Sequence, residues 1–388
     1  ATVTTADAAK SLVTTTGIDV LVGGSGDDTV TSDTATVSAS DSFDGGAGTD
    51  SFIKAFTGEG AVVLPSLTNV ESLTLREVDT DEDNTGASFD SWDHEGITTY
   101  ILEDLDDDFS LTNINASDVV KIIDNAGITV DVTVTHKSLT GTADSAKIEV
   151  DSFDASSDLL LGALETVTID SVGTTASTIA ALTVGSATTL NLNATNSALT
   201  ITESDGNGAE ATTTVNFTGA NKVTVTNAMS TSVTTVNGAD STGGSAFSLS
   251  GLTAPTFTGG TGADHVTVVT ADATVNTGTG DDKVEVNAIV MSTGSLDGGA
   301  GTDTLLISDD TANVFTTAAM SKISNFETLE IEVTTQTVDF NTLAGFTKLV
   351  IAGSTAVDLD DFSTTVAAAG VDITGVQTTS LIIETDNS

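Results

Sequence analysis

Five nine-residue segments carry glycine and aspartate at a fixed spacing, and they are the part of this sequence most suited to binding chemistry. They follow the template G-G-x-G-x-D-x-U-x, in which U is a large apolar residue, and they begin at Gly23, Gly45, Gly259, Thr277 and Gly298. The copy at Thr277 departs from the template only at its first glycine. Glycines permit the positive φ values of a tight turn and leave backbone carbonyls uncovered, while the sixth-position aspartate supplies a hard anionic oxygen. Each segment therefore offers half of an oxygen-lined cation site.

The spacing of the copies predicts that these half-sites stack. The apolar residue two positions after the aspartate begins a short inward-facing strand, so each segment is one turn plus one strand and two such units complete a coil. Gly259 and Thr277 are 18 residues apart, which places their turns one above the other on the same side. Asp282, in the middle of three consecutive turns, is expected to serve two sites or to lie between them. Oxygen donors alone favour Ca²⁺ over Mg²⁺ or Zn²⁺. The alternative, ordinary solvated turns, suits one copy better than five.

A longer duplication encloses the repeats. The segments 67–75 and 323–331 follow the copies at Gly45 and Gly298 with the same order of residue types, and 161–169 is a looser third version. In each, alternation after a glutamate predicts a half-buried strand, and the glutamate is expected to be a solvent-side or turn group. Between about 170 and 240, apolar pairs spaced two apart recur roughly every eight or nine residues, which predicts solenoid rungs. The segment 314–320 is the most compatible with a helix.

Composition points to the same fold class. The 388 residues include 14 Phe but only one Trp and one Tyr, so the core must be built from Val, Leu, Ile, Ala and Thr, which suit stacked strands. We predict an all-β protein made of parallel β-roll and β-solenoid segments with calcium-binding turns and short helices in insertions. The expected divisions are a first β-roll module at 1–78, an acidic β region at 79–160, a Thr/Ala-rich β-solenoid at 161–258, and a second β-roll module with a C-terminal β region at 259–388.

Charge and cysteine content exclude several classes of function. With 56 Asp and Glu against 10 Lys and Arg, the formal net charge is −46, so neither nucleic acid nor an anionic membrane surface is an expected partner. Divalent cations are the obvious counter-charge. The chain has no cysteine, which rules out disulfides, a thiolate nucleophile and a Cys-based zinc site. No apolar run reaches the roughly 18 to 20 residues of a membrane helix, so membrane insertion is not expected.

A second acidic cluster allows two interpretations. Asp79, Asp81, Asp83 and Asp90 fall at ligand positions of an EF-hand-like loop, but Asn84 replaces the usual glycine and no flanking helices are predicted. A solvated acidic loop is favoured over an isolated calcium site. The run of aspartates within 104–108 is likewise interpreted as a surface loop.

Enzyme motifs are not recognisable. His94 and Glu95 begin like the H-E-x-x-H zinc motif but lack the second histidine, and Ser25 lies in G-G-S-G-D rather than in a G-x-S-x-G nucleophile elbow. His265 occupies a variable repeat position and is expected to be an exposed turn residue. We therefore do not expect an enzyme.

These repeats resemble the calcium-binding repeats of RTX proteins, which are exported by type I secretion, and their sparse placement in a Thr/Ala-rich chain resembles the RTX-type bacterial surface-layer proteins. The resemblance implies a parallel β-roll in which stacked turns bind Ca²⁺ through backbone carbonyls and repeat aspartates. At most three copies are consecutive, so two or three stacked sites are expected rather than a long ion column. The predicted metal-site residues are Gly23, Ser25, Asp27, Asp28, Gly45, Ala47, Asp50, Gly259, Thr261, Asp264, Thr277, Thr279, Asp281, Asp282, Gly298, Ala300 and Asp303.

The leading hypothesis from these observations is a structural protein of an extracellular surface layer (S-layer), which assembles with further copies of itself in a Ca²⁺-dependent way at the cell surface. A cell-surface polysaccharide is a further expected partner. The alternatives are an RTX-type extracellular adhesin or biofilm-matrix fibre protein, and an enzyme whose catalytic domain lies outside this chain.

Overall fold

The chain folds as a parallel β-solenoid of about 13 turns with almost no helix, which confirms the predicted all-β class. The structure is a computed structural model. It describes residues 8–57, 60–78, 86–123, 129–141, 143–204, 211–287, 293–308, 317–332, 335–339, 345–352, 356–360, 372–374 and 380–383. Two compact units divide it, 1–191 with 196–211 (unit 1) and 192–195 with 212–388 (unit 2). The four divisions expected from the sequence stay a prediction.

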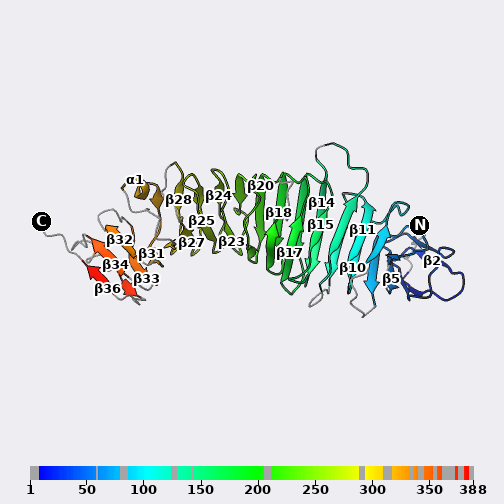
Figure 1. Ribbon diagram of the computed structural model, residues 1–388. Helices are drawn as coiled ribbons and strands as arrows, with labels where there is room; N and C mark the ends of the chain where they lie inside the picture. The colour runs from blue at the N-terminus through cyan, green and yellow to red at the C-terminus, as the bar shows by residue number, and fades with distance from the viewer. Residues whose placement is uncertain are drawn as a thin grey trace, which may run out of the picture. The chain divides into compact units, whose positions relative to one another are not determined.

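The strands of unit 1, drawn from blue to green in Figure 1, belong to three parallel sheets, two of 15 strands and one of three among the described residues. One sheet runs in the order β1-β3-β5-β8-β10-β12-β14-β16, a second β6-β9-β11-β13-β15-β17-β19, and a third β2-β4-β7. The strands are β1 (Ser11–Val13), β2 (Val20–Gly24), β3 (Thr29–Ser32), β4 (Ser42–Gly46), β5 (Ser51–Phe56), β6 (Gly60–Ala61), β7 (Ser66–Thr68), β8 (Ser72–Glu77), β9 (Ala87–Asp90), β10 (Thr99–Glu103), β11 (Phe109–Ile114), β12 (Val119–Ile123), β13 (Val132–His136), β14 (Ser145–Asp151), β15 (Leu159–Leu161), β16 (Thr166–Ser171), β17 (Ser177–Thr183), β18 (Thr189–Ala194) and β19 (Leu199–Ser204), with the last residues of β18 belonging to unit 2.

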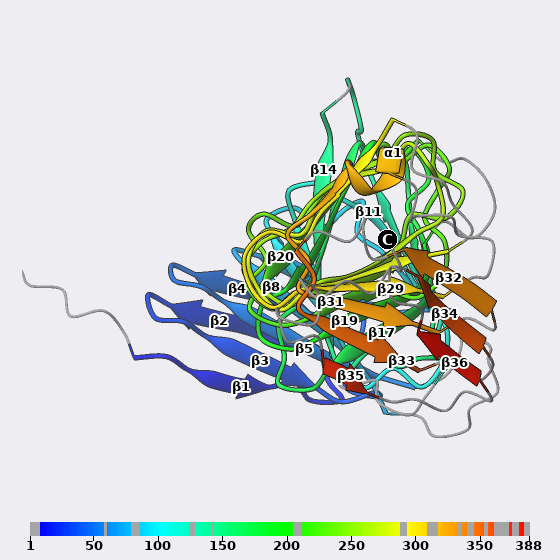
Figure 2. The ribbon, with the colours of Figure 1, turned by 90° about the vertical axis from the view of Figure 1, so that its left-hand side faces the viewer.

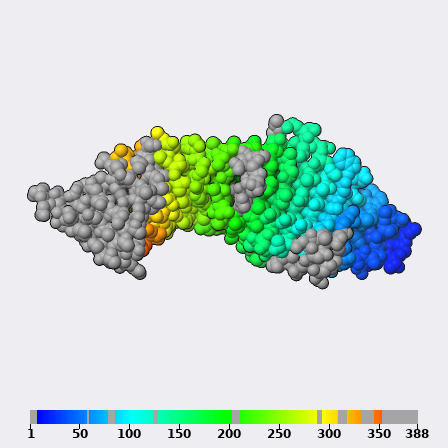
Figure 3. Space-filling view, viewed as in Figure 1, coloured from blue at the N-terminus to red at the C-terminus, as the bar shows by residue number. Residues whose placement is uncertain are grey.

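Unit 2 repeats the arrangement, with successive coils closely packed in the space-filling view (Figure 3). Its strands follow the orders β20-β22-β24-β26-β28-β30 and β21-β23-β25-β27-β29-β31-β33-β35, each part of a 15-stranded sheet, and β32-β34-β36 form a separate sheet. The elements are β20 (Thr214–Gly219), β21 (Val223–Val225), β22 (Thr235–Asn237), β23 (Ser245–Ser248), β24 (Thr256–Thr258), β25 (His265–Val268), β26 (Thr274–Asn276), β27 (Lys283–Val286), β28 (Ser295–Asp297), β29 (Thr304–Ile307), α1 (Thr317–Met320), β30 (Ile323–Ser324), β31 (Thr328–Ile331), β32 (Thr335–Asp339), β33 (Lys348–Ile351), β34 (Ala356–Asp360), β35 (Asp372–Thr374) and β36 (Ser380–Ile383).

Two strands and two turns make each coil around the repeats, as the 18-residue spacing predicts. Strand β24 leads through the turn at 259–264 into β25, and β26 leads through the turn at 277–282 into β27. The register pairs Thr258 with Asn276 and His265 with Lys283, so the two turns are stacked. The template turns occupy one side of the coil, and the return turn at 269–273 lacks the Gly-Asp pattern.

The interior is lined by the alternating apolar residues of each strand. Leu182 and Val184, Leu190 and Leu192, and the other predicted pairs of the Thr/Ala-rich segment are all buried, which confirms them as rungs. In unit 2 the rings of Phe217, Phe247 and Phe257 stack from coil to coil with centroids 5.1 and 4.9 Å apart. Helix α1 falls within the segment predicted to be helix-compatible, and no described helix has the length and apolar character to span a membrane.

Candidate metal centre

The repeat turns are joined to one another by backbone hydrogen bonds. The amide of Ala47 donates to the carbonyl of Gly24 at 2.8 Å, and Thr279 and Ala300 make the equivalent bond to Gly260 and Gly278 at 2.9 Å. In the turns that begin at Gly45, Thr277 and Gly298, the second and fourth residues are glycines with φ between 82° and 153°. Other residues rarely adopt this backbone conformation, which explains why the template requires glycine there.

The sixth-position aspartates form a ladder through unit 1. The amide N–H of Asp28 donates to Oδ1 of Asp50 one coil later at 2.7 Å, and the amide of Asp50 donates to Oε2 of Glu71 at 2.7 Å. The strand register aligns these three positions, because Thr29 pairs with Ser51 and Ser51 with Ser72. The glutamate that the sequence suggested was a solvent-side or turn group therefore ends a ladder of carboxylates.

Unit 2 carries a second ladder of the same design. Oδ1 of Asp264 accepts a hydrogen bond from the hydroxyl of Ser245 at 2.7 Å. One coil later, Oδ1 of Asp282 accepts from the amide of Asp264 at 2.7 Å, and in the next coil Oδ1 of Asp303 accepts from the amide of Asp282 at 2.8 Å. The amide of Asp303 donates to Oε2 of Glu327 at 2.8 Å. Asp282 thus lies between two other repeat carboxylates. Whether it serves two ion sites stays a prediction.

Each ladder aspartate leaves its second carboxylate oxygen without a hydrogen bond. Oδ2 of Asp28, Asp50, Asp264, Asp282 and Asp303 is buried and unpartnered among the described residues, and the five side chains are 0 to 3% exposed. A buried anionic oxygen without a hydrogen-bond donor is costly, so each of these oxygens is a candidate ligand for a cation.

First-position glycines keep open a small space beside these oxygens. A Cβ added to Gly23 would lie 2.3 Å from Oδ2 of Asp28 and 2.1 Å from the carbonyl oxygen of Gly45 in the next turn. At Gly259 the corresponding distances are 2.5 Å to Oδ2 of Asp264 and 2.1 Å to the carbonyl oxygen of Thr277. We call this space, with its converging carboxylate and carbonyl oxygens, the cradle. The cradle occurs at Gly23, Gly45 and Gly259. At Gly298 the carbonyl oxygen of Asn325 lies in the corresponding position, 2.1 Å from an added Cβ.

The middle level of the unit 2 ladder differs because Thr277 replaces the first glycine. Its hydroxyl donates to the carbonyl oxygen of Gly298 at 2.7 Å, and its side chain is fully buried. A side chain therefore occupies the cradle beside Asp282 and takes up the carbonyl that the glycine copies leave available.

Burial makes four of the ladder aspartates weaker acids. Burial, followed by the charges of Asp264 and Asp281, raises the pKa of Asp282 to about 6. Burial, with the charges of Asp282 and Glu327, raises the pKa of Asp303 to about 6. The pKa of Asp50 and that of Asp264 are also raised, in both cases chiefly by burial. The ionised ladder is thus under electrostatic strain that a cation would relieve.

The donors in the cradles suit a hard cation. Among the described residues, no three His, Cys, Asp or Glu side chains gather into one metal-binding group. A site here would instead combine one or two carboxylates with backbone carbonyls of adjacent turns, which is oxygen-only ligation of the kind Ca²⁺ accepts.

Other predicted repeat residues lie outside the cradles. Asp27 and Asp281, at the fifth position, are exposed and accept the amides of Thr49 and Thr302 at 2.8 and 2.9 Å. The side chains of the third-position residues are exposed, so only their backbone could contribute to a site; these residues are Ser25, Ala47, Thr261, Thr279 and Ala300.

Lysine replaces aspartate at the first level of the unit 1 ladder. Ser11 pairs with Thr29, which places Lys10 in register with Asp28. The amide of Lys10 donates to Oδ1 of Asp28 at 2.6 Å, and its ammonium donates to the carbonyl oxygen of Gly23. A tethered cation therefore occupies this end of the ladder.

The remaining acidic predictions have mixed outcomes. Asp79, Asp81 and Asp83 lie outside the described residues, and Asp90 ends β9, where its Oδ1 accepts from Asn113 and the amide of Trp92. The expectation that the 104–108 run is a surface loop is wrong in part: Asp106 is 7% and Asp107 is 1% exposed. Their amides donate to the buried carboxylate of Glu77 at 2.9 and 3.2 Å, which draws this segment inward.

His265 begins β25 rather than lying in a turn, and its side chain is 41% exposed. Its Nε2 lies 3.6 Å from Oε2 of Glu285 on the adjacent strand. Burial lowers the pKa of His265, with Glu285 opposing that shift.

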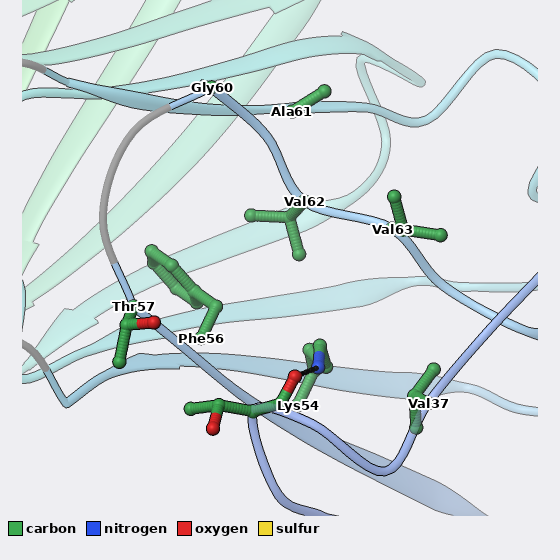
Figure 4. A pocket seen from close by; sticks show the side chains of 9 residues that line it. Val37, Lys54, Phe56, Thr57, Gly60, Ala61, Val62 and Val63 are labelled. Atoms are coloured by element: carbon green, nitrogen blue, oxygen red, sulfur yellow. Dashed lines mark hydrogen bonds between the residues drawn. The ribbon is translucent and has the colours of Figure 1, made fainter.

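A pocket of about 270 Å³ lies in unit 1 beside Lys54 (Figure 4). Lys54 is 4% exposed and its ammonium donates to the carbonyls of Asp33 and Thr34 at 3.2 and 3.4 Å. The wall also includes Phe56 and Val62, and no carboxylate or histidine is among the described lining residues. The pocket is therefore chemically unlike the cradles.

A comparison of the chain with protein-family models and with characterised proteins found no match.

Proposed function

We propose that the two ladders bind Ca²⁺ and that the protein is a calcium-dependent structural component of an extracellular surface layer. The observation that carries the calcium part is the set of five buried repeat aspartates, each with one unpartnered oxygen. Three of these oxygens, on Asp28, Asp50 and Asp264, lie beside a first-position glycine, where a carbonyl of the next turn converges on the same space. A cation held between adjacent turns would satisfy oxygens of both and join coils that otherwise repel each other.

The calcium part is tested by an isosteric substitution. Asp303→Asn retains an oxygen that can accept the amide of Asp282 but loses the carboxylate charge. We expect fewer bound Ca²⁺ ions in equilibrium dialysis. Glu332→Gln, the same loss of charge at an exposed residue of unit 2, should leave the ion count unchanged. Equal ion counts for both variants and the wild type would remove Asp303 from the site.

Self-assembly is the second part of the proposal, and two features support it. With a net charge of −46, copies of the chain repel one another until divalent ions bridge or neutralise their faces. Among the described residues, β1 and β2 are the edge strands of their sheets, seen at the rim of unit 1 in Figure 2. Val13, Ile18, Val20 and Val22 beside them are 62 to 74% exposed. Unpaired strand edges next to exposed apolar side chains are surfaces that pair with another chain.

Electron microscopy of the purified protein tests the assembly. With millimolar Ca²⁺ we expect ordered two-dimensional sheets, and light scattering should rise with CaCl₂ but not with NaCl of equal ionic strength. Screening removes repulsion without supplying coordination, so equal scattering in both salts would contradict calcium bridging. Fibres or isolated particles would instead favour an adhesin or matrix fibre. Location at the cell surface and binding to cell-surface polysaccharide have a common test. The purified protein is added to cells stripped of their surface layer, and the amount that binds to the cells is measured.

A further inference from the structure

Two turns outside the nonapeptide pattern have the same structure at the ends of the two ladders. They are Asn69-Val70-Glu71 in unit 1 and Asn325-Phe326-Glu327 in unit 2. Each follows a repeat turn by one coil, because Ser51 pairs with Ser72 and Thr304 with Thr328. Neither turn contains a glycine or an aspartate, so the nonapeptide template does not detect them.

The asparagine carbonyl of each turn stands where a repeat carbonyl stands at the other levels. A Cβ on Gly45 would lie 2.1 Å from the carbonyl oxygen of Asn69, and a Cβ on Gly298 would lie 2.1 Å from that of Asn325. The same 2.1 Å separates a Cβ on Gly23 from the carbonyl oxygen of Gly45. The asparagine turn therefore presents its carbonyl to the last cradle in the geometry that a further repeat would provide.

The conformation that aims this carbonyl is fixed in the same way in both units. Asn69 and Asn325 have φ of 52° and 57°, a left-handed conformation that asparagine tolerates better than most residues. Their side-chain amides donate to Oδ1 of Asp44 at 2.8 Å and of Asp297 at 2.7 Å. Among the described residues, no hydrogen bond ends on either asparagine carbonyl.

The glutamate of each turn brings a carboxylate to the same place. Oε2 of Glu71 accepts the amide of Asp50, and Oε2 of Glu327 accepts the amide of Asp303. The neighbouring Oδ2 of Asp50 and of Asp303 is unpartnered, and both aspartates are fully buried. Two carboxylates and an unbonded carbonyl thus meet at the last level of each ladder.

We propose that Asn69-Val70-Glu71 and Asn325-Phe326-Glu327 are closing half-sites, which complete the final divalent-cation site of each ladder. The asparagine supplies its backbone carbonyl, and the glutamate supplies negative charge in place of a sixth-position aspartate. This inference rests on the proposed calcium binding and adds two ligand-bearing turns to it. Short ladders of two or three repeats can then hold an ion at every glycine cradle, including the last.

The looser third copy provides an internal control. Glu165 accepts the amide of Asp144 at 2.9 Å, so the hydrogen bond to the preceding coil is present. Ala163 stands in place of the asparagine, and no nonapeptide precedes this turn. We therefore expect no cation there, although the glutamate makes the same hydrogen bond.

The test compares three glutamate-to-glutamine variants by equilibrium dialysis against EGTA-buffered Ca²⁺, with circular dichroism in EGTA to verify folding. Glutamine can still accept the amide hydrogen bond, so only the charge is lost. Glu71→Gln and Glu327→Gln should each weaken one ion at least tenfold. At a Ca²⁺ concentration equal to the wild-type Kd, the occupancy of each of these two sites should fall from about one half to about one tenth in the double variant. Glu165→Gln should match the wild type.

The outcomes separate this inference from the proposed function. If the wild type binds no Ca²⁺, the proposed function fails. If the wild type binds Ca²⁺ and all three glutamine variants bind equally, the closing half-sites are wrong and calcium binding by the repeats stands. Asn325→Gly permits the same φ and retains the carbonyl, so the ion count should be kept. Loss of an ion in that variant would show that the backbone carbonyl in the left-handed conformation is not sufficient, and would overturn the assignment of the carbonyl alone as the asparagine's contribution.

Discussion

Replacing Thr277 by glycine should create a cation site that the wild type lacks. Thr277 is the one first-position residue of the five repeats with a side chain, and its hydroxyl binds the carbonyl of Gly298 at 2.7 Å. Thr277→Gly would empty the cradle beside Asp282, release that carbonyl and restore the full template. Three cradles would then follow one another in unit 2.

The sign of the effect on stability should depend on calcium. Without metal, the variant loses a buried hydrogen bond that contributes about 1 kcal/mol to the free energy of unfolding. The greater backbone entropy of glycine in the unfolded chain costs roughly 0.5 to 1 kcal/mol more, so the variant should be less stable than the wild type by about 2 kcal/mol. A new ion at one hundred times its Kd contributes about 2.7 kcal/mol. Extracellular calcium sites commonly have Kd values of about 10⁻⁴ to 10⁻³ M, so about 10 mM Ca²⁺ approaches this regime.

Thermal unfolding in EGTA and in 10 mM CaCl₂, paired with calcium stoichiometry, is the assay. We expect the deficit of Thr277→Gly to be present in EGTA and to vanish or reverse in calcium, with about one additional ion bound. Thr279→Gly makes the same substitution two residues later at an exposed position of the same turn, and its deficit should be equal in both buffers. An equal deficit for Thr277→Gly in both buffers, with no additional ion, would refute the cradle as a cation site.

Three further predictions concern pH, the lysine end and chelation. Asp282 and Asp303 have a pKa of about 6 in the folded metal-free protein, above the ordinary 3.8, so metal-free stability should fall as pH rises from about 4 to 6. Calcium affinity should rise over the same interval and then level off, and an affinity independent of pH in calorimetric titrations would count against these ligands. Lys10→Met removes a positive charge and releases the carbonyl of Gly23, so unit 1 should bind Ca²⁺ several-fold more tightly; unchanged affinity would contradict the tethered-cation role. Chelation with EGTA should accelerate amide hydrogen exchange in 23–53 and 259–306 before the rest of the chain, and equal exchange with and without EGTA would argue against metal-supported turns.

The regular part of the fold could be predicted because its information is local. Glycine, aspartate and an apolar residue at fixed offsets define one turn and one strand, and the 18-residue interval between Gly259 and Thr277 already implies stacked turns. The apolar pairs of the Thr/Ala-rich segment are local in the same sense, since alternation along one strand decides which side chains face inward. The sixth-position aspartates could likewise be chosen from the template alone.

What the tertiary structure decided depends on residues one coil apart. The role of Glu71 follows from its hydrogen bond to the amide of Asp50, 21 residues earlier, and that of Lys10 from the carbonyl of Gly23. Coils of this chain vary in length, so sequence spacing does not say which residue lies above which, whereas the strand register does. The burial of Asp106 and Asp107 beside Glu77 could not be predicted for the same reason. A run of aspartates looks the same in the sequence whether it lies in solvent or packs against a neighbouring coil. The sequence by itself determined the repeating unit and its chemistry, and the stacking of coils determined where each ladder begins, where it ends and which cradle a side chain fills.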